Sequence, residues 1–185
     1  MIRVALLLAE GFEEAEAITP VDLLRRAGID CVTVSLAEEK LVPSSRHIPV
    51  LADSSWEEMD FDSCDGVVLP GGLAGTERLL ADARVEALLR RFCEEGKLTA
   101  AICAAPTVLA KAGLLAGRRA ICYPGLEDRL AGAEVCCETV VCDGTVITSR
   151  GMGTSVPFGL ALVEYFLGKE KADALAAKIV YKREA

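Results

Sequence analysis

The chain repeats one pattern that narrows its fold more than any other feature, a short apolar run followed by a helical stretch. The runs are Ile2–Leu8, Cys31–Leu36, Asp65–Leu69 and Leu98–Cys103. Continuous apolar runs rich in β-branched residues are typical of strands buried on both faces, as in parallel sheets. Strands that alternate with helices predict an α/β sandwich with a mostly parallel sheet at its centre.

The remaining stretches complete the predicted order of elements. Helices are expected at Glu13–Ala27, Thr76–Glu95, Ala104–Ala112, Thr154–Leu167 and Lys169–Lys178. Gly28 suits the end of the first helix, and the second is expected to break near Asp82. Further strands are expected at Arg119–Cys122, Val135–Cys142 and Val146–Ser149. Two short extended pieces around Pro43-Ser44-Ser45-Arg46 predict a small hairpin at a sheet edge.

Length and charge limit the partners that such a domain can have. With 185 residues, 52% of them hydrophobic, the chain supplies one sizeable core, and we expect a single domain over residues 1–185. Its formal charge of −8 repels phosphate backbones and argues against nucleic acid as a partner. The apolar run Val4–Ala9 is too short for a membrane span or a signal peptide. We therefore expect a cytoplasmic protein that does not enter membranes.

The cysteine and histidine content argues against disulfide and metal chemistry. None of the eight cysteines forms a C-x-x-C pair, and the one histidine, His47, excludes mechanisms that need two imidazoles. We expect Cys136, Cys137 and Cys142 to be small hydrophobic residues buried on strands. No metal and no cofactor is expected.

Three loops are the places to look for chemistry, because sites in open α/β sheets form beyond the carboxyl ends of the strands. The loop Ala9–Glu16 carries an acidic cluster, Pro70–Gly75 contains a double glycine, and Ile102–Pro106 places Cys103 between a strand and a helix. A nucleophile at such a turn projects from the sheet toward a helix N-terminus, which favours an anion and predicts a lowered thiol pKa. A buried structural cysteine is the alternative.

The neighbouring residues also allow two interpretations. Gly71-Gly72 suits a tight turn with no further role, but beside Cys103 the amides of Gly72 and Ala104 would form a pair of donors for an oxyanion. Glu16 lies near the start of its helix, where acidic residues are common because the helix dipole favours them.

Taken together, the motifs of this chain resemble the ThiJ/PfpI superfamily, and within it the branch of Parkinson disease protein 7. They are Glu13-Glu14-Ala15-Glu16, Pro20-Val21-Asp22, Arg25-Arg26-Ala27-Gly28-Ile29, Val67-Val68-Leu69-Pro70-Gly71-Gly72, Ala100-Ala101-Ile102-Cys103-Ala104-Ala105-Pro106, Thr148-Ser149-Arg150-Gly151 and Gly153-Thr154-Ser155. The resemblance runs nearly end to end. It implies a flavodoxin-like three-layer α/β/α sandwich, usually a homodimer, that works without a cofactor.

The resemblance also implies roles for single residues. Cys103 would be the reactive cysteine and Glu16 a protonated glutamate, with the amides of Gly72 and Ala104 in the pocket. The residues implied in substrate binding are Gly71, Tyr123, Glu13 and Arg46. Those implied near the dimer contact are Asp22 and Arg26, together with Arg46.

Two departures from the family pattern bear on mechanism. Tyr123 stands where the best-studied relatives have a histidine near the cysteine, and a phenol is a poor general base at neutral pH. The protease-like branch and the class I glutamine amidotransferases pair their nucleophile with a histidine, whereas Ala104 follows Cys103 here and His47 lies in the predicted edge hairpin. A Cys–His proteolytic mechanism is therefore not expected.

These residues support two main hypotheses of function. In the first, Cys103 adds as a thiolate to methylglyoxal or a similar aldehyde, or to its adduct on a protein or nucleotide, and Glu16 relays a proton until water releases a hydroxy acid. In the second, Cys103 is oxidised reversibly and the protein is a redox sensor or chaperone. An unrelated small-molecule hydrolase on the same fold is a third possibility.

Overall fold

A computed structural model describes residues 1–182, and its centre is a seven-stranded sheet with the strand order β10-β11-β7-β6-β1-β2-β5. All neighbouring strands pair in parallel except β10 and β11, which are antiparallel. The strands are β1 (Arg3–Leu8), β2 (Asp30–Ser35), β5 (Ser54–Ser55), β6 (Gly66–Leu69), β7 (Leu98–Ile102), β10 (Val140–Asp143) and β11 (Val146–Ser149). The mostly parallel sheet predicted from the apolar runs is confirmed.

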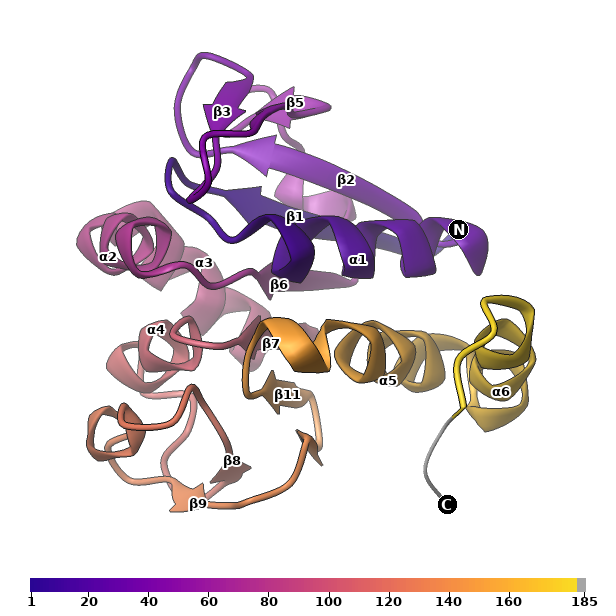
Figure 1. Cartoon of the computed structure of the whole chain (residues 1–185). Helices are drawn as coiled ribbons and strands as arrows, with labels where there is room; N and C mark the ends of the chain where they lie inside the picture. The colour runs from indigo at the N-terminus through magenta and orange to yellow at the C-terminus, as the bar shows by residue number, and fades with distance from the viewer. Residues whose placement is uncertain (183–185) are drawn as a thin grey trace.

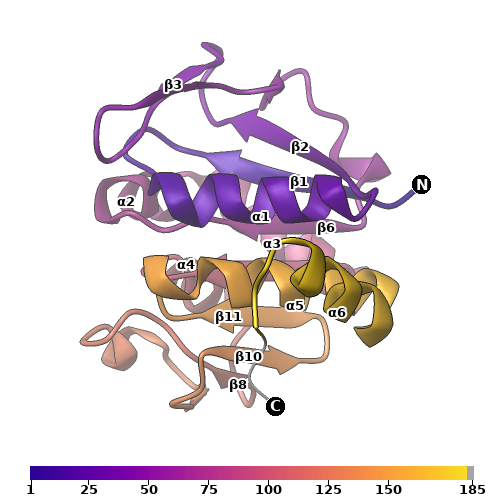
Figure 2. The ribbon, with the colours of Figure 1, turned by 45° about the vertical axis from the view of Figure 1, so that its right-hand side comes forward.

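Helices cover both faces of this sheet (Figures 1 and 2). The helices are α1 (Glu14–Arg26), α2 (Leu73–Ala81), α3 (Ala83–Glu94), α4 (Pro106–Lys111), α5 (Ser155–Leu167) and α6 (Lys169–Lys178). Successive side chains of β1 point to opposite faces: Ala5 and Leu7 pack with α2, α3 and α4, whereas Val4 and Leu6 pack with α1, α5 and α6. Two apolar cores therefore enclose the sheet, giving the flavodoxin-like three-layer sandwich.

Local signals account for the helix boundaries. The Glu13 side chain caps α1 by accepting from the Glu16 amide at 2.8 Å. The predicted break near Asp82 is confirmed, because the Asp82 side chain accepts from the Arg84 amide at 2.9 Å and starts α3. Short 3-10 helices occur at η1 (Phe61–Ser63), η2 (Glu127–Arg129) and η3 (Met152–Thr154).

The predicted hairpin is confirmed as β3 (Leu41–Pro43) and β4 (Pro49–Leu51), which pair antiparallel. It forms a two-stranded sheet of its own, however, and β5 is the edge strand of the main sheet. The predictions for the later strands are wrong in their bounds. The predicted strand Val135–Cys142 is two strands, because β9 (Glu134–Val135) pairs with β8 (Arg119–Ala120) while β10 turns back onto β11. The predicted strand Arg119–Cys122 is accordingly limited to β8.

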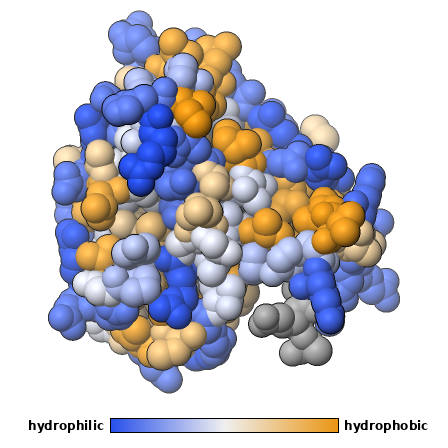
Figure 3. Space-filling model, viewed as in Figure 1, coloured by the Kyte–Doolittle hydropathy of each residue, from blue (hydrophilic) through white to orange (hydrophobic). Residues whose placement is uncertain are grey.

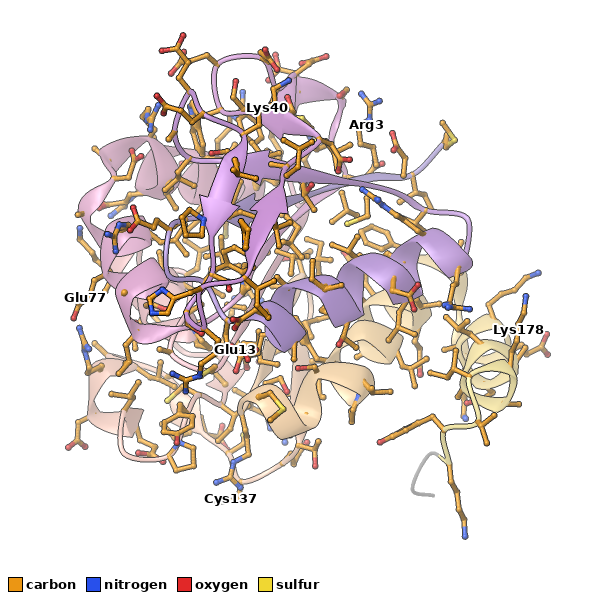
Figure 4. All side chains as sticks on the ribbon, turned by 45° about the horizontal axis from the view of Figure 1, so that its top comes forward. Arg3, Glu13, Lys40, Glu77, Cys137 and Lys178 are labelled. Carbon is orange, nitrogen blue, oxygen red and sulfur yellow. The ribbon has the colours of Figure 1, made fainter. Side chains whose placement is uncertain are left out.

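The expectation that the later cysteines are buried is also wrong. Cys137 and Cys142 are exposed and Cys136 is half-buried, and Figure 4 labels Cys137 at the rim of the molecule. Residues 136–139 lie between β9 and β10 and pair with neither sheet as a strand. Cys142 lies on the edge strand β10 and is exposed, whereas its neighbour Val141 is buried, because successive side chains of a strand point to opposite faces.

Candidate thiol active site

Three loops meet at one edge of the sheet because the strands before them are neighbours. β7, β6 and β1 lie side by side and run parallel, so their carboxyl ends open on the same edge. Two of the loops carry Cys103 and Gly71, and the third leads into the first turn of α1, where Glu16 lies. The Gly71 amide donates to Glu16 Oε2 at 3.0 Å, and a Cβ atom on Gly71 would collide with the Glu16 carboxylate and with Cys103 Cβ. Glycine at this position therefore lets the acid and the thiol approach each other.

Cys103 has a backbone conformation that few non-glycine residues adopt. Its φ of 65° lies in the left-handed region, which costs about 1–3 kcal/mol and persists only where the surroundings hold it. The Cys103 amide donates to the Ser149 carbonyl at 3.0 Å, and the Tyr123 amide donates to the Cys103 carbonyl at 2.7 Å. Because of this turn, α4 begins at Pro106 and not at Ala104 as predicted. The strand end and two neighbouring loops thus fix the position of the thiol.

Glu16 is a carboxyl group with almost no access to solvent, since it is 1% exposed. Its side chain is hydrogen-bonded to Cys103 and to the Gly71 amide. Burial raises the pKa of Glu16 to about 7; the two hydrogen bonds oppose this shift, and the Glu13 carboxylate adds to it. Glu16 therefore exchanges its proton near neutral pH, which an exposed helix-capping carboxylate does not do.

The pKa of the Cys103 thiol shifts in the direction opposite to the one predicted from the sequence. Burial and the adjacent Glu16 carboxylate raise the pKa of Cys103 to about 12, although the amides of Gly72 and Ala104 donate to the sulfur and lower it. The predicted lowering of the thiol pKa is therefore wrong, because burial disfavours the thiolate and because a thiolate and the Glu16 carboxylate in contact repel each other. A thiolate at Cys103 therefore requires that the proton retained by the pair rest on Glu16.

Cys103 opens into a pocket of about 510 Å³. The predicted site residues that line this pocket are Glu13, Arg46, Gly72, Cys103, Ala104 and Tyr123. Tyr123 is 50% exposed, whereas Glu16 and Gly71 are buried beside the thiol, out of the pocket lining. Asp22 and Arg26 lie apart from the pocket, where they form an ion pair with each other along α1 at 2.6 Å.

The β3–β4 hairpin forms the outer wall of the pocket and contributes residues that the sequence reasoning missed. Glu14 accepts from Ser44 Oγ at 2.6 Å, Ser45 Oγ at 2.9 Å and the Arg46 amide at 2.7 Å. These bonds hold the hairpin turn over the N-terminal end of α1, near the labelled Glu13 in Figure 4. His47 consequently lines the same pocket as Cys103. The acidic cluster was visible in the sequence, but its partners lie some 30 positions away.

Neither a metal-binding cluster nor a membrane-spanning helix occurs in the part of the chain that the structure describes. Within residues 1–182, no group of three or more histidine, cysteine, aspartate or glutamate side chains is arranged to hold a metal ion. No helix in that range combines the length and the apolar character needed to cross a membrane.

Known proteins resemble this chain over most of its length. The family model described as the DJ-1/PfpI family matches residues 2–165. The chain is 44% identical to the protein dj-1beta of Drosophila melanogaster over 172 residues, which covers 92% of each chain. It is 34% identical to a deglycase of Pyrococcus abyssi over 154 residues, covering 82% of this chain and 92% of that one.

A solved structure shares this fold along nearly the whole chain. The structure of oxidized Toxoplasma gondii DJ-1 superimposes with a TM-score of 0.95 at 34% identity and covers 99% of this chain and 100% of its own. The family match, the sequence identities and the shared fold lead to one conclusion. The chain belongs to the DJ-1/PfpI family.

Proposed function

We propose that this protein is a cysteine-dependent glyoxalase or deglycase that needs no cofactor and acts on methylglyoxal-type aldehydes or their adducts. In this role it would serve in defence against carbonyl and oxidative stress. The observation that carries the proposal is the hydrogen-bonded contact of the buried Glu16 carboxyl with the Cys103 thiol, beside an open pocket of about 510 Å³. The similarity to a protein named as a deglycase supports it.

The first step is addition of the thiol to the aldehyde. With the shared proton on Glu16, the Cys103 sulfur forms a bond to the aldehyde carbon, and the electrons of the C=O π bond move to oxygen. The amides of Gly72 and Ala104, which donate toward the sulfur in the free protein, are placed to stabilise the oxyanion. Glu16 then gives its proton to that oxygen, which produces a neutral hemithioacetal and leaves Glu16 ionised.

The second step moves a proton between neighbouring carbons. The Glu16 carboxylate takes the proton from the former aldehyde carbon, which gives an enediol, and returns it to the adjacent carbon. The hydroxyl proton of the hemithioacetal passes to the neighbouring oxygen in the same step, so the product is a thioester of a hydroxy acid. Water then breaks the C–S bond and releases the acid. One carbon is oxidised and its neighbour is reduced, so the reaction requires no external electron acceptor.

The test is multiple turnover. Purified protein treated with a chelator and incubated with methylglyoxal is expected to form many equivalents of lactate per chain, measured by an enzyme-coupled assay. One equivalent or less, with the aldehyde remaining on the protein, would contradict the proposed activity. A glycated amino acid offered in place of free methylglyoxal then separates the two substrate forms, because only a deglycase releases the amine from a stable adduct.

A redox sensor or chaperone that works through oxidation of Cys103 is the second candidate. The amides beside the sulfur favour it, because they would also stabilise a sulfinate. The structure of T. gondii DJ-1 is of an oxidized form. A stoichiometric, peroxide-dependent change in partner binding without aldehyde turnover would favour the sensor over the enzyme.

The oligomeric state and location are proposals of the same kind. Asp22 and Arg26, each about half exposed, lie on α1 beside Ile18, which is 42% exposed. Apolar surface also gathers over the β3–β4 hairpin at the top of Figure 3, where Leu41 and Leu51 are exposed. These surfaces support a homodimer, which sedimentation equilibrium would detect. The eight free cysteines suit the reducing cytoplasm.

A further inference from the structure

His47 lines the thiol pocket although the sequence places it 56 positions from Cys103. Its backbone φ of 61° lies in the left-handed region. Histidine adopts this region more often than most residues do, but the conformation is still costly and requires support from its surroundings. A residue held in a strained conformation at a pocket is a candidate for a functional role.

The turn that carries His47 is held by hydrogen bonds at every residue. The His47 amide donates to the Ser44 carbonyl at 3.1 Å, and the Ile48 amide donates to Ser44 Oγ at 3.0 Å. The Ser45 amide donates to the Phe12 carbonyl at 2.7 Å, and the Glu14 carboxylate accepts from the turn as described above. The backbone that places His47 at the pocket is therefore fixed by hydrogen bonds.

The proposed reaction leaves one step that the buried side of the site does not supply. Glu16 is 1% exposed, so it can move a proton between substrate carbons but lies away from bulk water. The water that hydrolyses the Cys103 thioester enters through the open side of the pocket. That water needs a proton acceptor on the same side.

Besides Cys103, six ionisable residues line the open side of the pocket. They are Glu10, Glu13, Arg46, His47, Arg78 and Tyr123. Guanidinium groups accept no proton, and a phenol keeps its own at neutral pH. The Glu13 carboxylate accepts from the Glu16 amide at 2.8 Å, and the Glu10 carboxylate is paired with Arg78 at 3.4 Å. Imidazole is the side chain that both accepts and returns protons near neutral pH.

We infer that His47 is the base that activates the hydrolytic water in this pocket, an inference that rests on the proposed function. The water oxygen forms a bond to the thioester carbon while one water proton passes to His47. The tetrahedral intermediate then expels the Cys103 sulfur with the electrons of the C–S bond. The acid product leaves, and the imidazolium returns its proton to the solvent or to the Cys103–Glu16 pair.

The experiment compares wild type with His47→Asn and Ile48→Asn. Asparagine tolerates positive φ, so His47→Asn removes the base and retains the turn, while Ile48→Asn changes an exposed neighbour outside the pocket lining. Lactate formation from methylglyoxal is measured together with the intact mass of the protein during turnover. We expect His47→Asn to lose about 10² of turnover, to accumulate an acyl group on Cys103, and to regain activity on addition of free imidazole.

The outcomes separate this inference from the function on which it rests. Absence of lactate with the wild-type protein would overturn both. Normal wild-type turnover with an equally active His47→Asn variant would overturn the role of His47 alone. A slow His47→Asn variant that neither accumulates acyl-Cys103 nor responds to imidazole would also overturn it, since that behaviour indicates only a structural effect of the turn.

Discussion

The two walls of the thiol pocket are built by different means. The inner wall is Cys103, with Glu16 and Gly71 buried directly behind it, and it follows the ends of adjacent parallel strands. The outer wall, the turn of the β3–β4 hairpin, is largely exposed and is held mainly by the Glu14 carboxylate. The comparison indicates that strand topology fixes the reacting groups, whereas side-chain hydrogen bonds place the groups that meet substrate and water.

The largest expected effect tests whether the inner wall alone carries the nucleophile. Cys103→Ser is expected to reduce lactate formation to background, because a hydroxyl at this position lacks the ionisation and nucleophilicity of a thiol. The melting temperature should change little, since serine differs by one atom and keeps both backbone hydrogen bonds. Cys142→Ser is the control, because Cys142 lines a separate cavity between β10 and α5. Equal activity of the two variants would remove Cys103 from the proposed mechanism.

The next effect concerns the proton that the inner wall shares. Glu16→Gln keeps a hydrogen-bond donor toward the sulfur but cannot relay a proton, so turnover should fall by about 10²–10⁴. In the wild type, kcat/KM should rise as the pH passes about 7. At that pH the doubly protonated pair of Cys103 and Glu16 loses one proton and retains the shared one. A Gln variant that retains wild-type turnover would show that Glu16 relays no proton and is only an acidic residue favoured at a helix N-terminus.

The inner wall is also the part of the site that the sequence predicts. Buried apolar runs identify parallel strands, adjacent parallel strands end at one edge, and this reasoning alone selects the loops of Glu16, Gly71 and Cys103. What it missed is the direction of the shift in the thiol pKa. That direction depends on a contact between side chains 87 positions apart, Glu16 and Cys103, and on burial, neither of which a local pattern encodes.

The outer wall escaped prediction for a different reason. Two short extended pieces indicate a hairpin, but nothing in their periodicity says where the hairpin packs. Its position follows from the three bonds to Glu14 and from the Ser45–Phe12 backbone bond at 2.7 Å. The sequence pattern alone therefore predicts His47 at a sheet edge, whereas the structure brings it to the pocket.

A third, smaller effect is the loss of folding stability that the buried Glu16 carboxylate causes at neutral and higher pH. Burial raises the pKa of Glu16 from its ordinary value of 4.5 to about 7, so between these pH values the folded state binds more protons than the unfolded state. Stability therefore falls as the pH rises through this window, by up to ~3 kcal/mol at ~1.4 kcal/mol per pKa unit. Glu16→Gln should match wild type near pH 4 and exceed it at pH 8 in urea denaturation. Parallel stability curves for the two proteins would contradict the raised pKa.

The smallest effect falls on the outer wall and tests how independent it is of the inner one. Glu14→Ala removes the acceptor of three hydrogen bonds at the hairpin turn. The global free energy of unfolding should fall by only about 1–2 kcal/mol, because the turn is partly solvated and water replaces much of the lost bonding. Native-state hydrogen exchange is the sharper measurement: the Arg46 and Ile48 amides should lose protection, while amides of β7 should not. Glu77→Gln, an exposed change on α2, is the matched control.

Because the Glu14→Ala variant leaves Glu16 and Cys103 in place, alkylation of Cys103 should keep its wild-type pH dependence even as the hairpin loosens. If the exchange of β7 amides or the pH dependence of Cys103 moved together with the hairpin, the two walls would be one cooperative unit, and the contrast drawn between strand ends and hairpin would be wrong.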